Sequence, residues 1–334
     1  MQRMILAALI AFATSLALGP ALLPLLRRLK LGQNVFELGP KSHQSKQGTP
    51  TMGGWLIFLI GATVSLAFHA GAWRPGTDMM LAALLLATGN LCIGFADDLM
   101  KIRRKRNRGL SPKQKMAGQI VLALAFAAYC YAHPQVGDGV TVPFFRAEWK
   151  LGWLYIPAAA FVIVATANSA NLLDGLDGLL GSVALVDMAT FGLLALLVAG
   201  VARGGEEAGN LINLSVFCCA TAGACMGFLR FNVFPARLFM GDTGSMFLGG
   251  AVAAVALLLR LPLLIPIVCV CMVASSVSDI LQIGYFKLTH GKRIFKMAPL
   301  HHHFEMLGTP ESKITAMYTI VTAACCLLGL LGVM

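Results

Sequence analysis

The chain has 334 residues, of which 57% are hydrophobic and only 12% are charged. Soluble domains carry about 25% charged residues, so this composition excludes an ordinary soluble protein and favours surfaces that face lipid. The formal net charge of +11 comes from 26 Lys and Arg against 15 Asp and Glu. We interpret this excess as topogenic charge flanking membrane spans, not as a nucleic-acid surface, and expect no nucleic-acid partner.

The first apolar run, residues 4–26, is longer than the core of a signal peptide, which is about 7–15 residues. Arg27 and Arg28 follow it at once, so we interpret it as a first membrane span. The nine cysteines lie in apolar stretches without a Cys-x-x-Cys motif, and this pattern indicates packing rather than metal or disulfide roles.

Runs without charge, each long enough to cross about 30 Å of hydrocarbon, predict an all-α polytopic membrane protein with one domain over 1–334. Only Arg260 separates the eighth span from the ninth, so a tight hairpin is the simplest interpretation there, with a re-entrant pair as the alternative. The ten predicted spans are 4–26, 47–73, 79–96, 116–137, 151–173, 188–202 (preceded by 178–186 and a lone Asp187), 208–229, 243–259, 261–278 and 314–334.

The basic residues predict the orientation of these spans. Ten spans place both termini on one side, and the loops of the other side, with Lys313, hold 20 of the 26 Lys and Arg residues. The positive-inside rule puts that side in the cytoplasm and both termini in the periplasm. The predicted cytoplasmic loops are about 27–51, 97–115, 168–180, 230–242 and 286–313.

The first polar cluster on this side is Asp97-Asp98, with Lys101 close behind. Adjacent carboxylates repel each other unless a cation or a proton lies between them. Mg²⁺ binds one or two carboxylates together with substrate phosphates, and lysines can face phosphate as point charges. The pair therefore indicates phosphate chemistry, and a cap at the interfacial end of a helix is the alternative.

Asn168, Asn171, Asp174 and Asp177 recur every three residues at the inner end of the fifth span. This spacing lines one face of a helix or of its frayed end. Such a face packs poorly but forms hydrogen bonds well. A ligand-binding face and a merely solvated face are equally compatible with the pattern.

Asp242 opens the eighth span in a Gly-Asp-Thr-Gly-Ser run. The free amides of a helix start, together with this carboxylate, can hold a metal-phosphate unit, and ordinary N-capping is the alternative. The triplet His301, His302 and His303 lacks a spaced fourth ligand, so zinc is disfavoured. Hydrogen bonding to phosphate fits imidazoles better, with loose surface histidines as the alternative.

These segments resemble the bacterial phospho-N-acetylmuramoyl-pentapeptide transferases, a branch of the polyprenyl-phosphate N-acetylhexosamine-1-phosphate transferases. The Asp-Asp pair, NLLDGLDG and GDTGS fit the larger family, whereas SKQGTPTMGG and MAPLHHHFE are more specific to the branch. The resemblance covers essentially the whole chain and implies ten helices with both termini periplasmic.

The resemblance also implies the reaction. The donor would be UDP-N-acetylmuramoyl-pentapeptide and the acceptor undecaprenyl phosphate, with Mg²⁺ as the cofactor and lipid I and UMP as the products. The enzyme would lie in the bacterial inner membrane with its active site on the cytoplasmic face, and it would serve peptidoglycan synthesis. The oligomeric state stays open, with a homodimer as one candidate.

Residue roles carry over by position. The resemblance implies a catalytic centre of Asp97, Asp98, Asp242 and His301, in which Asp242 binds the metal. Of Lys113 and Lys115, one is expected to meet phosphate. The implied substrate-binding positions are Lys46, Lys101, Lys113, Lys115, Asn168, Asn171, Asp174, Asp177, Phe239, Gln282, His302 and His303.

The acceptor phosphate has a second pKa of about 6, so it is mostly a dianion at neutral pH and needs no strong base. We expect a single displacement in which Asp97 orients or deprotonates this phosphate, and a two-step route through an aspartyl-phosphate stays open. The alternative activities are transfer of N-acetylglucosamine-1-phosphate and, more remotely, transport. A transporter needs ionisable groups near the midplane, and the few candidates are Asp187 and, nearer the outer ends of the spans, His69 and His133. For the lone Asp187 we predict hydrogen-bonded packing between helices rather than a substrate path.

Overall fold

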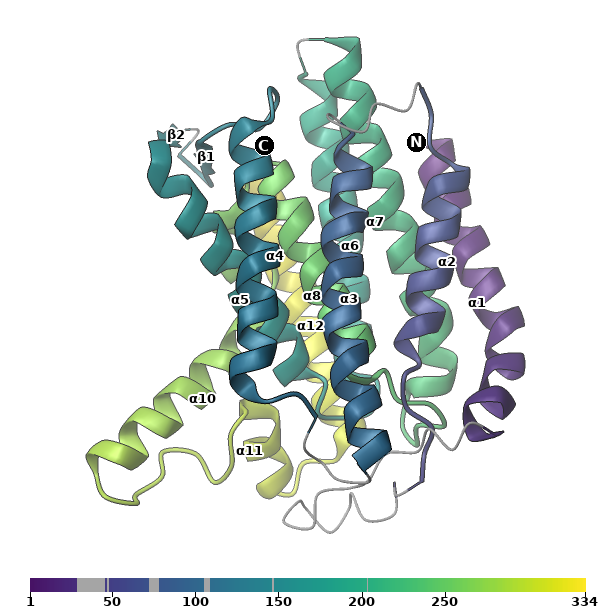
Figure 1. Cartoon of the computed structure of the whole chain (residues 1–334), viewed down its shortest axis with the longest axis vertical. Helices are drawn as coiled ribbons and strands as arrows, with labels where there is room; N and C mark the ends of the chain where they lie inside the picture. Colours follow the sequence, from purple (N-terminus) through teal and green to yellow (C-terminus); the bar gives the residue numbers. More distant parts are fainter. Residues whose placement is uncertain (29–45, 47, 72–77, 105–108, 146, 203) are drawn as a thin grey trace.

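The structure is a computed structural model of all 334 residues, and it describes them apart from 29–45, 47, 72–77, 105–108, 146 and 203. The described chain is a bundle of long helices with one short β-hairpin (Figure 1). The helices are α1 (Gln2–Arg28), α2 (Gly54–Ala67), α3 (Met79–Arg104), α4 (Pro112–Ala132), α5 (Tyr155–Leu173), α6 (Leu179–Gly200), α7 (Gly205–Asn232), α8 (Gly241–Leu258), α9 (Ile265–Val268), α10 (Val270–Leu288), α11 (Leu300–Met306) and α12 (Glu311–Leu331), with 3-10 turns η2 (Gly152–Leu154) and η3 (Pro262–Leu264).

Among the described residues, eight helices are long and apolar enough to cross a membrane: α1, α3, α4, α5 (extended by η2), α6, α7, α8 and α12. A bent pair, Pro262–Val268 with Val270–Leu288, adds a ninth if it counts as one span, and α2 is a shorter apolar helix. The prediction of a polytopic helical membrane protein is therefore confirmed. Each of the ten predicted spans overlaps one of these helices or the bent pair.

Helices α7 and α8 form the centre of the bundle. In the apolar stretches of α7 and α8, 83% and 89% of the residues are buried, against 22% in α1 and 28% in α12. Helix α8 packs against α2, α3 and α5, and α7 packs against α1, α2 and α6. The outer helices therefore present the apolar surfaces that lipid would cover, while α8 is surrounded by other helices along its length.

Several helices continue beyond the charge-free runs that predicted them. Helix α3 extends through the charged residues to Arg104, because Asp97 and Lys101 pair at i and i+4 and its last turn is basic, which suits a helix C-terminus. Helix α4 begins at Pro112 behind a capping box between Ser111 and Gln114. The predicted loop 97–115 is thus largely helical.

The lone Asp187 does not interrupt a helix. It lies fully buried inside α6, where Oδ1 accepts a weak hydrogen bond from Cys326 Sγ at 3.9 Å. Asp187 therefore makes a polar contact within helix packing, as the sequence predicts.

The strands β1 (Gly139–Val142) and β2 (Ala147–Lys150) form an antiparallel pair between α4 and α5, which the all-α prediction did not include. Arg260, in the turn after α8, pairs with Glu148 and accepts a hydrogen bond from Thr141 N at 2.8 Å. The joint between the eighth and ninth predicted spans is therefore a tight turn fixed to this hairpin.

After that turn the chain breaks again. The short α9 and the longer α10 meet at an angle of 85°, so the ninth predicted span is a bent pair and not one straight helix. Figure 1 shows α10 leaving the bundle sideways at the lower end, with α11 beside it, below the bundle.

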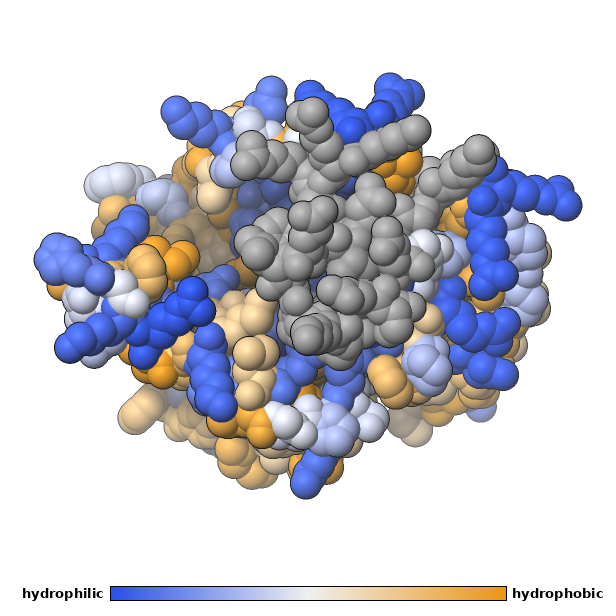
Figure 2. Space-filling model, turned by 90° about the horizontal axis from the view of Figure 1, so that it is seen from below, coloured by the Kyte–Doolittle hydropathy of each residue, from blue (hydrophilic) through white to orange (hydrophobic). Residues whose placement is uncertain are grey.

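Both termini lie at the upper end of the bundle, opposite the end where α3 stops and α11 lies (Figure 1). Figure 2 views the lower end and shows hydrophilic side chains in blue gathered around its rim, with hydrophobic side chains between and behind them. The last turns of α3, the start of α8 beside them, and α11 lie at this end, and they carry Asp97, Asp98, Asp242 and the three histidines (Figure 1).

Candidate active site

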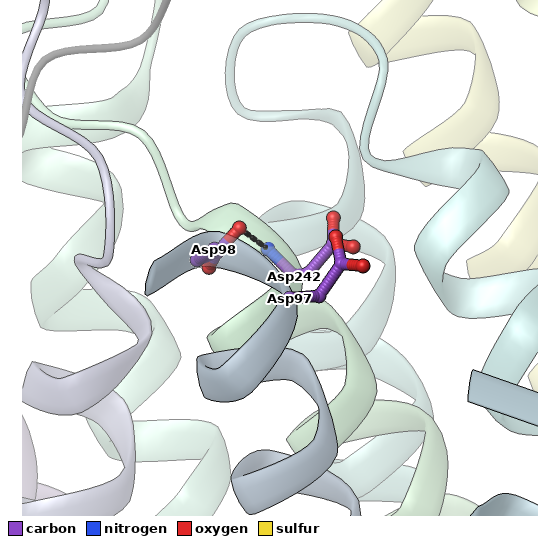
Figure 3. Close-up of side chains that lie close together, drawn as sticks. All are labelled: Asp97, Asp98 and Asp242. Atoms are coloured by element: carbon purple, nitrogen blue, oxygen red, sulfur yellow. Dashed lines mark hydrogen bonds between the residues drawn. The ribbon is translucent and has the colours of Figure 1, made fainter. Parts of the chain in front are cut away.

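Three carboxylates meet where the last turns of α3 face the first turn of α8 (Figure 3). Asp97, Asp98 and Asp242 each offer an oxygen, and these atoms all lie within 4.8 Å of one another. Residues 145 positions apart in the chain are brought together because Gly94 lets the two helices approach. A Cβ at Gly94 would lie 2.2 Å from the carbonyl oxygen of Asp242.

Two lysines neutralise part of this charge. The Lys101 ammonium lies 2.7 Å from Asp97 Oδ2 and 3.1 Å from Asp242 Oδ2, and Lys115 Nζ lies 2.9 Å from the same Asp242 oxygen. Lys113 is exposed, so Lys115 is the member of the pair that reaches the cluster.

Asp98 is engaged differently from its neighbour. Its carboxylate accepts hydrogen bonds from the backbone amides of Asp242 and Thr243, at 3.2 and 2.9 Å, and from the Thr243 hydroxyl at 2.7 Å. These amides are among those that an α-helix start leaves without partners. Asp98 thus caps α8 from a neighbouring helix and holds Asp242 in place.

The two carboxylate oxygens of Asp97 have different partners, a backbone amide and the Lys101 ammonium. Its Oδ1 accepts from Leu110 N at 2.8 Å, and its Oδ2 faces Lys101. Asp97 is 4% exposed, so its carboxyl group is largely removed from bulk water. Such a group can act on a bound substrate without competition from solvent.

The polar run 168–177 divides between two places because α5 ends at Leu173. Asn171 donates to Asp242 Oδ1 at 3.0 Å and to Ser245 Oγ at 2.9 Å, so it belongs to the carboxylate cluster. Asn168 donates to Gln119 Oε1 at 3.0 Å, one turn further into the bundle.

Asp177 joins a separate ion-pair group. Lys46 Nζ lies 2.7 Å from Asp177 Oδ1 and 2.5 Å from Glu311 Oε1 at the start of α12. Asp177 also accepts from Ala236 N at 2.9 Å, in the segment that leads to α8. Lys46 therefore ties three distant parts of the chain together beside the cluster.

Asp174 is the C-cap of α5, and in the sequence it lies between Asn171 of the carboxylate cluster and Asp177 of the ion-pair group. Burial raises the pKa of its carboxyl well above the ordinary value, and the nearby charges of Asp242, Asp98 and Asp177 raise it further. A cation or a hydrogen-bonding substrate beside Asp174 would relieve this unfavourable charge.

The three histidines lie on the short helix α11 and point to different partners. His301 is fully buried, with Nε2 so near Gly175 that an added Cβ there would lie 2.3 Å away. His302 Nδ1 lies 3.0 Å from Glu305 Oε2, and His303 Nδ1 accepts from Lys296 N at 3.1 Å. The three imidazoles therefore have different surroundings, although they are consecutive in the chain.

Two further predicted positions make backbone contacts. The Gln282 side chain is hydrogen-bonded to the backbone of segment 294–295, to which it donates once and from which it accepts twice. Phe239 pairs through its backbone with Pro50 and Gly53, at 2.8 Å each, and its ring is half-buried. Gln282 thus shapes the loop before α11, and Phe239 joins the 50–53 segment to the start of α8.

Sequence reasoning missed several members of the site. Thr243, Ser245, Gln119 and Glu311 contact predicted residues, as described above. Thr243 and Ser245 stand in the same GDTGS run as Asp242, which is a local signal. Gln119 and Glu311 had no local signal, because they become neighbours only when α4 and α12 pack.

The donor set suits a magnesium ion. Asp97 and Asp242 present carboxylate oxygens, the ligands that Mg²⁺ prefers, and the Lys101 ammonium bridges them in this structure. The Asp97 and Asp242 oxygens are therefore spaced so that one positive charge can contact both. Asp98 is less suited, because its oxygens are occupied by the α8 amides.

Comparison with known proteins agrees with this arrangement. The family described as glycosyl transferase family 4 matches residues 80–260, which include the whole carboxylate cluster. The chain is thus a membrane-embedded member of that class of transferase.

Closely similar relatives define the branch. A protein of Clostridium novyi (strain NT), named phospho-N-acetylmuramoyl-pentapeptide-transferase, is 44% identical over 99% of this chain and 97% of its own length. Relatives of the same name from Thermoanaerobacter sp. (strain X514) and Clostridium kluyveri are 45% and 43% identical, over 96% and 99% of this chain and 96% and 100% of their own lengths. The chain belongs to the phospho-N-acetylmuramoyl-pentapeptide transferase family.

Proposed function

We propose that this chain transfers phospho-N-acetylmuramoyl-pentapeptide from UDP-N-acetylmuramoyl-pentapeptide to undecaprenyl phosphate, and so forms lipid I and releases UMP. Relatives that carry the name of this transferase match it along almost its entire length. The structural observation that supports the proposal is the meeting of Asp97, Asp242, Lys101 and Lys115 at one end of a membrane helix bundle. That cluster suits two phosphate-bearing substrates, one of which is a lipid.

The proposal includes a placement in the bacterial inner membrane. We propose that the eight long helices, the short α2 and the bent pair α9–α10 serve as ten spans of a single domain, which would leave both termini in the periplasm. The basic residues favour this orientation, because they concentrate at the end that carries the cluster. The active site would then face the cytoplasm, where nucleotide-linked donors are made.

Magnesium is the proposed cofactor. When bound by Asp242 with Asp97, it would supply positive charge to the pyrophosphate and to the departing UMP. Lys101 and Lys115 add fixed positive charge beside the same oxygens.

The main barrier is repulsion between the anionic acceptor and the anionic donor. Two unit charges at about 4 Å repel by about 4 kcal/mol at an effective dielectric of 20, and several such pairs are present. Lys101 and Lys115 offset this repulsion, and Asp97 orients the acceptor phosphate or removes its last proton. An acceptor oxygen then bonds to the sugar-linked phosphorus as the bond to UMP breaks.

The neighbouring group around Lys46 is the proposed site for the nucleotide half of the donor. Lys46 pairs with Asp177, which accepts a hydrogen bond from Ala236 N in the segment that leads into α8. In the same segment, Phe239 is hydrogen-bonded through its backbone to Pro50 and Gly53. His301 and His302 border Gly175, between Asp174 and Asp177. A donor lying along this path would place its pyrophosphate at Asp242.

Stereochemistry at the transferred phosphorus separates the one-step route from a route through an aspartyl-phosphate. A donor with a chiral phosphorothioate should give inversion, because one displacement inverts the centre. Retention would contradict the single displacement and favour a covalent carboxylate intermediate.

The activity itself is tested with detergent-solubilised protein and undecaprenyl phosphate. UMP release is expected with the muramoyl-pentapeptide donor, little with UDP-N-acetylglucosamine, and none after a chelator removes divalent cations. Preference for UDP-N-acetylglucosamine would contradict the proposed donor, and unchanged release with the chelator would contradict the proposed cofactor.

A further inference from the structure

A second polar site lies away from the carboxylate cluster, where the C-terminal ends of α1 and α7 run side by side (Figure 1). A pocket of about 610 Å³ opens there, within the size range of ligand sites. The two helices approach closely because α1 has Gly19 at the contact. An added Cβ on Gly19 would lie 2.2 Å from the ring of Phe231.

The pocket has an apolar wall. Leu16 and Leu23 of α1 and the Phe231 ring of α7 line it, and Leu23 and Phe231 are otherwise buried against the bundle. Pro20 and Pro24 complete this wall. The wall continues the lipid-facing surface of α1, so a hydrocarbon chain could enter it from the bilayer.

Four arginines form the rim: Arg27, Arg28, Arg230 and Arg237. All four are exposed, and among ion pairs between described residues none involves them. Topogenic charge explains why arginines stand on this side of the membrane. It does not explain why four of them, from three separate segments, surround one pocket.

The two prolines add hydrogen-bond acceptors to the same place. Proline has no amide hydrogen, so Pro20 and Pro24 leave the carbonyls of Leu16 and Pro20 without their usual partners four residues later. Both residues line the pocket. A headgroup with hydroxyls could donate to these oxygens while its phosphate meets the arginines.

We propose that this pocket binds an anionic phospholipid of the surrounding leaflet, with the phosphate on the four arginines and an acyl chain along the apolar wall of α1. Guanidinium groups bind phosphate oxygens in bidentate fashion, and basic pockets between membrane helices are suited to such headgroups. The site is separate from the transferase reaction proposed above, and only the choice of leaflet rests on the proposed orientation.

The bound lipid would also restrain the segment between α7 and α8. Arg237 and Leu238 donate backbone hydrogen bonds to Phe231 O, at 2.8 and 3.1 Å, and the chain then passes through Phe239 to Asp242. A phosphate that holds Arg237 beside Arg230 therefore stabilises the segment from which α8 starts.

The test measures lipid binding to the purified full-length protein by native mass spectrometry, with thermal shift as a second readout. Phosphatidylglycerol should bind and raise the melting temperature. Phosphatidylcholine with the same acyl chains, and inorganic phosphate alone, should do so weakly or not at all. Equal binding of phosphatidylcholine would overturn the role of the arginines, and an equal shift by inorganic phosphate would overturn the role of the acyl chain.

Variants locate the site. Arg230→Gln with Arg237→Gln should weaken phosphatidylglycerol binding on the order of 30-fold, whereas Lys292→Gln with Arg293→Gln, an equal loss of charge at exposed residues after α10, should change it less than about twofold. Arg230→Lys with Arg237→Lys should bind more strongly than the glutamine pair but less strongly than wild type, because lysine keeps the charge and loses the bidentate contact.

Equal weakening by both glutamine pairs would overturn the proposal, because binding would then follow net charge alone. Stronger binding of undecaprenyl phosphate than of phosphatidylglycerol at these arginines would overturn the choice of ligand. Because these readouts use no donor, they are independent of whether the transferase assay succeeds.

Discussion

At the scale of single residues, the two lysines at the start of α4 have different surroundings. Lys115 contacts Asp242 and Asn171, whereas Lys113 is exposed. Lys115→Gln should therefore reduce UMP release by about 10²-fold, since it removes one fixed donor from the reacting phosphates. Lys113→Gln is the matched control and should stay within about threefold of wild type. Equal losses in both variants would argue against a role for the contact with Asp242.

The sequence could predict which residue types gather at this end of the molecule, but not how each is used. Asp97 and Asp98 are indistinguishable as adjacent aspartates, and only the approach of α8 makes one a cap and leaves the other facing Lys101. The regular spacing of Asn171 and Asp177 suggested one polar face. The end of α5 between them sends them to different partners.

Asp174 gives a prediction about pH. Its pKa is raised in the folded protein, so folding favours the protonated form, and its contribution to stability is lost as the pH rises from the unfolded value of 3.8 through the raised folded value. Asp174→Asn is neutral at every pH and avoids this loss. In the presence of a chelator the variant should melt at a higher temperature than wild type near pH 8, with a smaller difference near pH 5. A difference that grows toward low pH would contradict the direction of the shift.

At the scale of helices, the contact between α3 and α8 carries the site. Gly94→Ala would push a methyl group into the Asp242 carbonyl, a backbone atom that cannot rotate away. We expect a loss of about 1–3 kcal/mol in stability, together with reduced UMP release because Asp242 is displaced. Gly284→Ala in α10 meets nothing within 4 Å and should leave both unchanged or slightly improved. Unaltered melting and activity in Gly94→Ala would mean that the helices can separate without harm to the site.

Apolar runs located the helices well because lipid and helix packing both demand apolar residues. They located helix ends poorly, since the capping box at Ser111 and the basic last turn of α3 extend helices into charged sequence. The bend between α9 and α10 could not be predicted, because it falls at Cys269 within an apolar stretch that has no charged residue.

At the scale of the whole molecule, the proposed orientation follows from the distribution of basic residues. Residue 204, before α7, and residue 113, at the start of α4, should lie on opposite sides of the membrane. Gly204→Cys should react with a membrane-impermeant maleimide in intact cells, because an added side chain there meets open space. Lys113→Cys should react only after permeabilisation, with wild type as the background for the native cysteines. The reverse pattern would invert the orientation.

The measurement that tests the central claim most directly is the turnover of Asp97→Asn beside its affinity for the donor. Asparagine can still accept the Leu110 amide, so the backbone should be held while the negative charge facing Lys101 is lost. The catalytic constant should fall by about 10²–10⁴-fold, with the dissociation constant of UDP-N-acetylmuramoyl-pentapeptide nearly unchanged. A variant that turns over at close to the wild-type rate would contradict the assignment of this cluster as the place where the phosphosugar is transferred.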